Sequence, residues 1–207
     1  MSTTNYFDVF SLPRKLVLDT AALEKAYYAQ SRKLHPDRFA AKPIAEQEAA
    51  LAAASQLNDA YRTLKEPIAR TEYLLALEGV QMEEQSKQAT DAARASGAEK
   101  KQITPPDLLE EVFELNMQLE EMRMNRKLGE NDPQLVKDLA AAKANFEGRL
   151  AATQTELEAV WAKWDAGVDA DDAAAKDSAK ENMVALLNKR GYVRNLVRDV
   201  NEVLEQE

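Results

Sequence analysis

The residues with the most distinctive chemistry in this chain of 207 are three consecutive ones, His35, Pro36 and Asp37. Pro36 lacks a backbone N–H and disfavours helical geometry at the residue before it, so the chain must turn at this point. The chain has only one histidine and no cysteine, and we find no glycine-rich phosphate loop, so no catalytic constellation can be assembled. Taken alone, the tripeptide is compatible with an ordinary surface loop.

The segment around this tripeptide is cationic. Residues 25–42 contain five basic residues and a single acidic one, Asp37, in a chain whose net charge is -9. Such a patch would steer the protein towards an acidic partner surface and should be sensitive to salt, although an ordinary solvated face would have the same composition. The basic residues are Lys25, Arg32, Lys33, Arg38 and Lys42.

The composition excludes several kinds of site. Without cysteine and with one histidine, the chain cannot form disulfides, perform thiol catalysis, or hold zinc or an iron–sulfur cluster through thiolate or multiple imidazole ligands. The many glutamates are expected to be solvated helix faces. We therefore expect no metal, no cofactor and no enzymatic activity of the chain itself.

The charge is unevenly distributed along the chain. Residues 1–80 contain ten basic and ten acidic residues, whereas residues 81–207 contain 17 and 26 and therefore carry the whole net charge. This asymmetry predicts two domains with different partners and argues against a nucleic-acid partner. No signal-peptide pattern and no apolar run long enough for a membrane span is present, so a soluble cytoplasmic protein is expected.

Helix signals dominate the first 80 residues. Asn5 can cap a short first helix that Pro13 closes, and Asp19 or Thr20 can cap a second that runs to about residue 34. A loop at 35–45 precedes a third helix over about 46–65, and Pro67 suits the first position of a fourth that ends before Gly79. The third helix is expected to bury the stripe Leu51, Ala54, Leu57, Asn58, Tyr61 and Leu64.

The remainder predicts a polar connector followed by three long helices. The capping box Thr104–Asp107 begins a helix that stops at Gly129, Asp132-Pro133 begins the next, which Gly167 and residues 169–172 close, and the last extends to the C-terminus. Long helices joined by short turns must pair antiparallel to bury their apolar stripes. The predicted fold is all-α, with an N-terminal helical hairpin over 1–80, a connector over 81–103 and a three-helix bundle over 104–207.

In this context the chain resembles the J-domain family, whose members stimulate ATP hydrolysis by DnaK-class chaperones. In that family the loop and the cationic face of the preceding helix contact the chaperone, which implies this role for Tyr27, Arg32, Lys33, His35, Pro36, Asp37 and Arg38. One departure is that Tyr28 and Ala29 stand where general J-proteins have two basic residues, which favours a dedicated chaperone partner. The residues that carry the resemblance are Tyr6, Leu12, Tyr27, His35–Arg38, Asn58, Ala60, Tyr61 and Leu64.

The second half resembles the HscB family of J-type co-chaperones for iron–sulfur cluster assembly. A J-domain followed by an acidic three-helix bundle, with Glu72–Leu75 at the junction, is similar to that family, and neither a Gly/Phe-rich segment nor a cysteine-rich module is present. The resemblance implies that the bundle binds the scaffold protein IscU and delivers it to an HscA-type chaperone. The alternative is a J-protein that delivers a different client to a general DnaK-type chaperone.

The helix that begins near residue 105 has two apolar faces, which is more than a three-helix bundle needs. Leu109, Phe113 and Met117 share one face, while 108, 112, 115 and 119 form another. An exposed 109–113–117 row would be an apolar docking patch rimmed by carboxylates, and the opposite assignment, with this row in the core, stays open. The resemblance to the HscB family implies client binding by this stretch, with the candidates Leu108, Leu109, Glu111, Phe113, Glu114, Met117 and, on the last helix, Tyr192.

Two alternatives to this interpretation remain. Trp161 and Trp164 are compatible with a ligand pocket, although two tryptophans three residues apart on a helix are more often core. The chain is also compatible with a coiled-coil-like scaffold that resembles a J-domain by accident.

Overall fold

The computed structural model describes residues 5–80 and 106–205, and every regular element in these ranges is a helix. This confirms the all-α prediction. The predicted connector 81–103 and the cap residue Thr104 lie outside the described residues. Within the described ranges, no helix combines the length and the apolar character that crossing a membrane requires.

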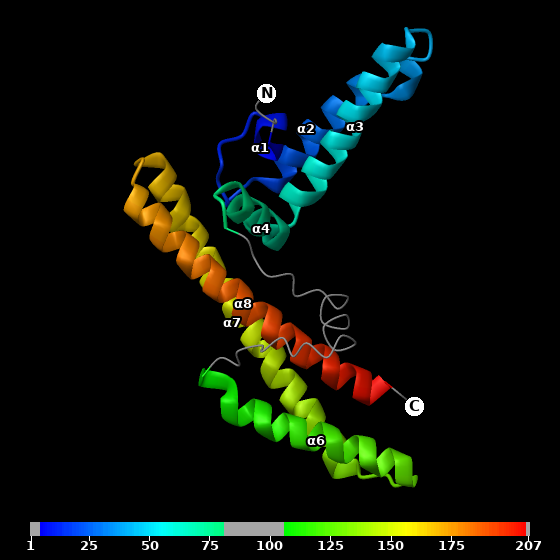
Figure 1. Cartoon of the computed structure of the whole chain (residues 1–207), viewed down its shortest axis with the longest axis vertical. Coiled ribbons are helices and arrows are strands. Elements are labelled where there is room, and N and C mark those ends of the chain that lie inside the picture. Colours follow the sequence, from blue (N-terminus) through cyan, green and yellow to red (C-terminus); the bar gives the residue numbers. More distant parts are fainter. Residues whose placement is uncertain (1–4, 81–105, 206–207) are drawn as a thin grey trace. The chain divides into compact units, whose positions relative to one another are not determined.

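The N-terminal part is a helical hairpin with a short helix before it and another after it (Figure 1). Helix α3 contacts each of the other three helices, so it is the centre of this part. The elements are α1 (Tyr6–Val9), α2 (Thr20–Lys33), the 3-10 turn η1 (Pro36–Arg38), α3 (Ile44–Lys65) and α4 (Pro67–Leu77).

Local side-chain contacts explain where these helices begin. Asn5 accepts from the Asp8 N–H, and the Asp8 carboxylate accepts from the Asn5 N–H, so the two residues form a complete capping box for α1. Asp19, one of the two predicted caps, accepts from the N–H groups of Ala21 and Ala22 and thus caps α2. Pro67 occupies the first turn of α4, where a missing N–H costs no hydrogen bond.

The C-terminal part contains η2 (Pro106–Leu108), α6 (Leu109–Leu128), α7 (Pro133–Asp169) and α8 (Ala173–Glu205). Helix α6 ends at Gly129, whose φ of 71° is the left-handed conformation that glycine adopts without strain. Asp132 accepts from the N–H groups of Gln134 and Leu135 and caps α7 as predicted. Gly167 does not end α7, which continues to Asp169; a Cβ at Gly167 would lie 3.2 Å from the Lys176 side chain, so the glycine permits a close approach at the helix turn.

The chain divides into two compact units whose boundaries fall inside α7 and α8. The first unit contains residues 1–82 and 159–181, and the second contains 83–158 and 182–207. The prediction that Trp161 and Trp164 are core residues is confirmed, since they are 4% and 2% exposed, and both belong to the first unit. The core of the second unit is built from α6, α7 and α8 and includes Leu115, Leu139, Phe146, Val193 and Val200.

The buried stripe of α3 differs from the predicted one. Leu51 is 68% exposed and Asn58 is also exposed, whereas Ala50 and Ala60 are buried together with Leu57 and Leu64. Small alanines let α3 approach its neighbours closely, which moves the buried side of the helix away from Leu51.

Asp165, near the C-terminal end of α7, forms hydrogen bonds with the loop between α1 and α2. Its two carboxylate oxygens accept from the N–H of Leu16 at 2.7 Å and the N–H of Val17 at 3.0 Å. The neighbouring Trp164 indole donates to the Arg14 carbonyl at 2.9 Å. Burial lowers the pKa of Arg70, and the negative charge of Asp165 opposes this shift and stabilises the buried guanidinium.

Replacing Asp165 with alanine is therefore expected to destabilise the first unit by about 2 kcal/mol, because two backbone donors lose their acceptor and the buried Arg70 loses a nearby negative charge. Urea unfolding followed by tryptophan fluorescence measures the change. Asp169→Ala, which removes only an exposed partner of Lys15, is the matched control and should cost well under about 1 kcal/mol. Equal effects of the two substitutions would contradict this role of Asp165.

Asp107 links the start of α6 to α8 through Lys189, whose ammonium lies 2.8 Å from the carboxylate. The hydrogen bond from Lys189 lowers the pKa of Asp107. Because the folded-state pKa lies below the unfolded one, the stabilisation is present above the unfolded pKa and is lost as pH falls through the folded one.

We expect Asp107→Asn to reduce the free energy of unfolding at neutral pH by less than about 1 kcal/mol, since the pair is largely exposed. The difference between the variant and the parent protein should vanish in the acid range. Urea unfolding at a series of pH values tests this, and a difference independent of pH would refute it.

Candidate functional site

The His-Pro-Asp tripeptide forms an exposed turn directly after α2. Pro36 is the first residue of η1, and the Asp37 N–H donates to His35 Nδ1 at 3.4 Å. The side chains of His35 and Asp37 are 58% and 89% exposed. The turn therefore presents an imidazole and a carboxylate to solvent from a defined backbone.

Gln47, on the first turns of α3, holds the loop that follows. Its side-chain amide donates to the Lys42 carbonyl at 2.8 Å and reaches the Ala40 carbonyl at 3.5 Å. This tether was not expected from the sequence, because a glutamine on an exposed helix face gives no signal of its target. Gln47 thus limits the positions open to the segment between η1 and α3.

Tyr27 joins the two long helices of the hairpin. Its ring stacks on Tyr61 with centroids 4.2 Å apart, and its hydroxyl donates to Asn58 Oδ1 at 2.9 Å. Tyr61 in turn donates to the Glu24 carboxylate at 3.1 Å. Tyr27 is only partly exposed, so in this structure it fixes α2 against α3 and offers a partner only part of its side chain.

The cations of the predicted patch stay available to a partner. Arg32, Lys33 and Arg38 are exposed, and the structure shows no ion pair for any of them within residues 5–80 and 106–205. Arg32 and Lys33 also lie in the last turn of α2, where positive charge complements the helix dipole. The structure thus brings these three cations to the same end of the hairpin as His35 and Asp37.

A second candidate surface lies on α6. Leu109, Phe113 and Met117 are 57%, 68% and 59% exposed, while the other apolar face of the helix is buried. Glu114 is also exposed beside this row, and Glu111 is paired with Arg149 of α7. The question of which face of α6 is open is answered by the structure: the 109–113–117 row faces solvent.

Leu108 and Tyr192, two further candidates for client contact, lie elsewhere. Leu108 is completely buried and Tyr192 is 8% exposed, and both belong to the core of the second unit. Leu108 immediately precedes α6 and falls on its buried face, so its side chain supports the bundle and has no exposed surface for a client. Tyr192 has little accessible surface.

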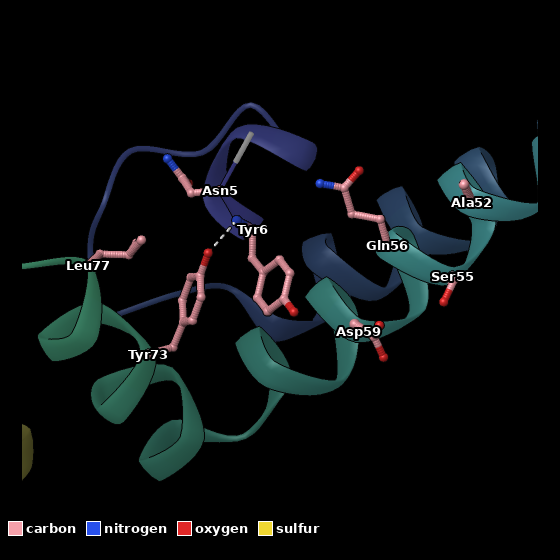
Figure 2. A pocket seen from close by; sticks show the side chains of 8 residues that line it. All are labelled: Asn5, Tyr6, Ala52, Ser55, Gln56, Asp59, Tyr73 and Leu77. Carbon is pink, nitrogen blue, oxygen red and sulfur yellow. Dashed lines mark hydrogen bonds between the residues drawn. The ribbon is translucent and has the colours of Figure 1, made fainter. Parts of the chain in front are cut away.

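A hollow of about 640 Å³ opens in the first unit between α1, α3 and α4 (Figure 2). Tyr6 and Tyr73 stack on one side of it with ring centroids 4.4 Å apart, and α3 contributes Gln56 and Asp59. The Tyr6 N–H donates to the Tyr73 hydroxyl oxygen at 2.9 Å. This bond satisfies one of the backbone donors that a helix N-terminus leaves without an internal partner.

We expect Tyr73→Phe to lower the free energy of unfolding by about 1 kcal/mol, because the ring stack survives while the Tyr6 N–H loses its acceptor. Thermal unfolding followed by circular dichroism measures the loss. Tyr28→Phe, which alters an exposed tyrosine on α2, is the control and should leave stability unchanged. If Tyr73→Phe left the free energy of unfolding unchanged, the hydrogen bond between the Tyr6 N–H and the Tyr73 hydroxyl would not contribute to holding α1 in place.

No group of three or more metal-ligating side chains occurs in the part of the chain that the structure describes. The features that it does assemble are a polar loop with unpaired cations beside it and an exposed apolar row on α6. Both are exposed to solvent.

Comparison with known proteins identifies the domain family of the segment that carries the His-Pro-Asp loop. The DnaJ domain family matches residues 5–73, which contain α1 to α3, the loop and most of α4. Residues 5–73 are a DnaJ domain. The resemblance that Tyr6, Tyr27 and the His-Pro-Asp tripeptide carry is thereby confirmed.

Relatives extend the similarity beyond the DnaJ domain. The chain is 44% identical over 89 residues to a protein of Burkholderia multivorans called "Co-chaperone protein HscB homolog", which covers 43% of this chain and 51% of that one. It is 37% identical over 116 residues to a Vibrio cholerae protein of the same name, with 56% and 60% covered. The chain thus matches between half and 60% of the length of these relatives.

Solved structures share the fold of this chain over most of its length. Chaperone HscB from Vibrio cholerae matches with a TM-score of 0.51 over 92% of this chain and 96% of that one. The crystal structure of human co-chaperone protein HscB matches with a TM-score of 0.58 over 95% and 82%. Both are 24% identical to this chain, and they confirm the fold, a DnaJ domain followed by a helical bundle.

Proposed function

We propose that this chain is a J-type co-chaperone that binds an IscU-type iron–sulfur scaffold protein through its C-terminal bundle and delivers it to an HscA-type chaperone. In this role it stimulates the ATP hydrolysis of that chaperone and hydrolyses no ATP itself. The relatives named co-chaperone HscB support this proposal, as does the DnaJ domain.

The observation that carries the proposal is the exposed His-Pro-Asp turn with three unpaired cations beside it. DnaK-class chaperones are the partners that the J-domain family implies, and a cationic surface on a chain of net charge -9 favours association with an acidic partner face. The proposed chaperone contacts are His35, Pro36, Asp37 and Arg38 with Arg32 and Lys33, and Tyr27 positions α2 beneath them.

The bundle supplies the proposed client site. A row of large apolar side chains that is more than half exposed has no role in the core of the second unit, and such rows mark protein–protein contacts. The proposed client contacts are Leu109, Phe113 and Met117, with Glu114 beside them. Leu108 and Tyr192 act by supporting this surface from the core.

The choice of chaperone separates this proposal from its alternative, delivery of another client to a general DnaK-type chaperone. We would measure steady-state ATP hydrolysis by purified HscA-type and DnaK-type chaperones with increasing amounts of the full chain. Stimulation of the HscA-type chaperone at lower concentrations of the chain supports the dedicated partner, as expected from Tyr28 and Ala29 on α2. Preferential stimulation of the DnaK-type chaperone would favour the alternative, and stimulation of neither would contradict both.

A further inference from the structure

The exposed apolar row of α6 does not stop at Met117. Met124 and Leu128 are 59% and 63% exposed. With 3.6 residues per turn, positions 113, 117, 124 and 128 project from the same side of the helix. The row from Leu109 to Leu128 therefore spans about 28 Å at a rise of 1.5 Å per residue, which is nearly the whole length of α6.

The charge beside this row changes sign along the helix. Between residues 109 and 117 there are three carboxylates and no cation, at Glu110, Glu111 and Glu114. A hollow of about 440 Å³ between α6 and α7 adds Asp138 to the acidic side of this half. From residue 118 to 128 there are three cations and two carboxylates, and the cations Arg123, Arg126 and Lys127 fall at the C-terminal end of the helix. Arg123 is paired with Glu120, whereas no ion pair of Lys127 is seen among residues 5–80 and 106–205.

The order of these charges also suits the helix dipole, which favours acids in the first turn and bases in the last. The dipole does not account for Met124 and Leu128, since two large apolar side chains exposed at the end of a helix cost solubility and stabilise nothing in the bundle core. An apolar row with opposite charges at its two ends is complementary to a surface of the reverse polarity.

We infer that the client surface of α6 extends over its whole length and is bipolar. It binds a client with an apolar ridge that carries basic residues at one end, against Glu110 and Glu114, and acidic residues at the other, against Lys127 and against Arg123, which would exchange its pairing with Glu120 for the client. The charges fix the direction in which the client lies along α6. This inference rests on the proposed function, because it takes the scaffold protein as the client.

Isothermal titration of the full-length chain with a purified IscU-type scaffold protein tests the inference with two double variants. Met124→Ser/Leu128→Ser is expected to raise Kd about tenfold, because it removes the apolar end of the surface. Ile44→Ser/Leu51→Ser is the matched control, since it removes two side chains of similar exposure, 74% and 68%, from the DnaJ domain. This control should leave Kd unchanged.

The second variant, Arg123→Glu/Lys127→Glu, discriminates by the sign of its effect. On a bipolar surface it should weaken binding about tenfold at low salt, with a smaller effect at high salt. A client that meets only the acidic half would bind this variant equally well or more tightly, and that result would overturn the inference.

The outcomes separate the inference from the proposed function. If the parent chain binds the scaffold and Leu109→Ala/Phe113→Ala weakens binding while both double variants bind normally, the extended surface is wrong and the proposed function stands. If the parent chain itself does not bind the scaffold, the proposed function fails and the inference fails with it. The helicity of each variant should be unchanged at these exposed positions, and only Arg123→Glu/Lys127→Glu should lower the melting temperature slightly, because it opposes the helix dipole and removes the pair with Glu120. A large loss of helicity would indicate a folding defect.

Discussion

Replacing His35 with glutamine is expected to lower the stimulation of chaperone ATP hydrolysis by at least about tenfold at co-chaperone concentrations well below saturation. The imidazole is 58% exposed on the turn that begins with Pro36, and glutamine cannot present the same ring to a partner. A contact at the centre of an interface commonly contributes 2 kcal/mol or more, which is about a thirtyfold change in affinity.

The His35→Gln variant should fold normally, because the imidazole is largely exposed and its hydrogen-bond partner is the neighbouring Asp37 on the same turn. Single-turnover hydrolysis measures the effect, and circular dichroism verifies the helicity. Glu72→Gln is the control, since it changes one exposed polar residue of α4 in the same domain. Full stimulation by His35→Gln would show that the similarity to a DnaJ domain carries no chaperone function here.

The second large effect is expected from Leu109→Ala/Phe113→Ala. Both side chains are more than half exposed, so their truncation should leave the free energy of unfolding of the bundle nearly unchanged. If they are the apolar centre of the client surface, the pair should raise the Kd for the scaffold protein about a hundredfold or more. Stimulation of the chaperone in the absence of scaffold should stay at the parental level.

The matched control for this pair is Leu51→Ala, which truncates an equally exposed leucine on α3. Surface plasmon resonance with immobilised scaffold gives the affinities, and thermal unfolding gives the stabilities. Normal scaffold binding by the double variant would remove α6 from the client site. A large fall in melting temperature would instead mean that the two side chains support the fold.

The sequence predicts the helix boundaries better than any other part of the fold, because a boundary depends on side chains that act on backbone groups only a few residues away. The capping box of Asn5, the first-turn proline of α4 and the left-handed Gly129 each act on backbone groups within a few residues, so their effect can be deduced without the tertiary structure. The exposure of His35 and Asp37 could be deduced in the same way, because a turn that connects two amphipathic helices lies at the protein surface, where water satisfies its backbone polar groups.

Contacts between distant segments could not be deduced in this way. Periodicity identifies an apolar stripe but not its neighbour, so the burial of Ala50 in place of Leu51 depends on how closely α3 meets the other helices. The carboxylate of Asp165 is one of many on α7, and nothing in its local sequence reveals that it accepts from Leu16 and Val17. The division into two units likewise arises from tertiary packing. The first unit includes residues 159–181, which are the C-terminal end of α7 and the beginning of α8.

The client surface was predictable in part. Two apolar faces on α6 indicated that one would be free, but the sequence could not say which, because both have helical spacing. The structure places Leu109, Phe113 and Met117 in solvent and Leu108 in the core. Tyr192 was expected on the surface, whereas packing against the neighbouring helices leaves it only 8% exposed.

Single-turnover ATP hydrolysis by an HscA-type chaperone tests the central claim most directly, with the chain added alone and then together with the IscU-type scaffold protein. The proposed function predicts synergy: the chain and the scaffold together should accelerate hydrolysis by more than the product of their separate effects. Stimulation by the chain that the scaffold does not change would contradict scaffold delivery, and it would leave a J-type co-chaperone whose client is a different protein.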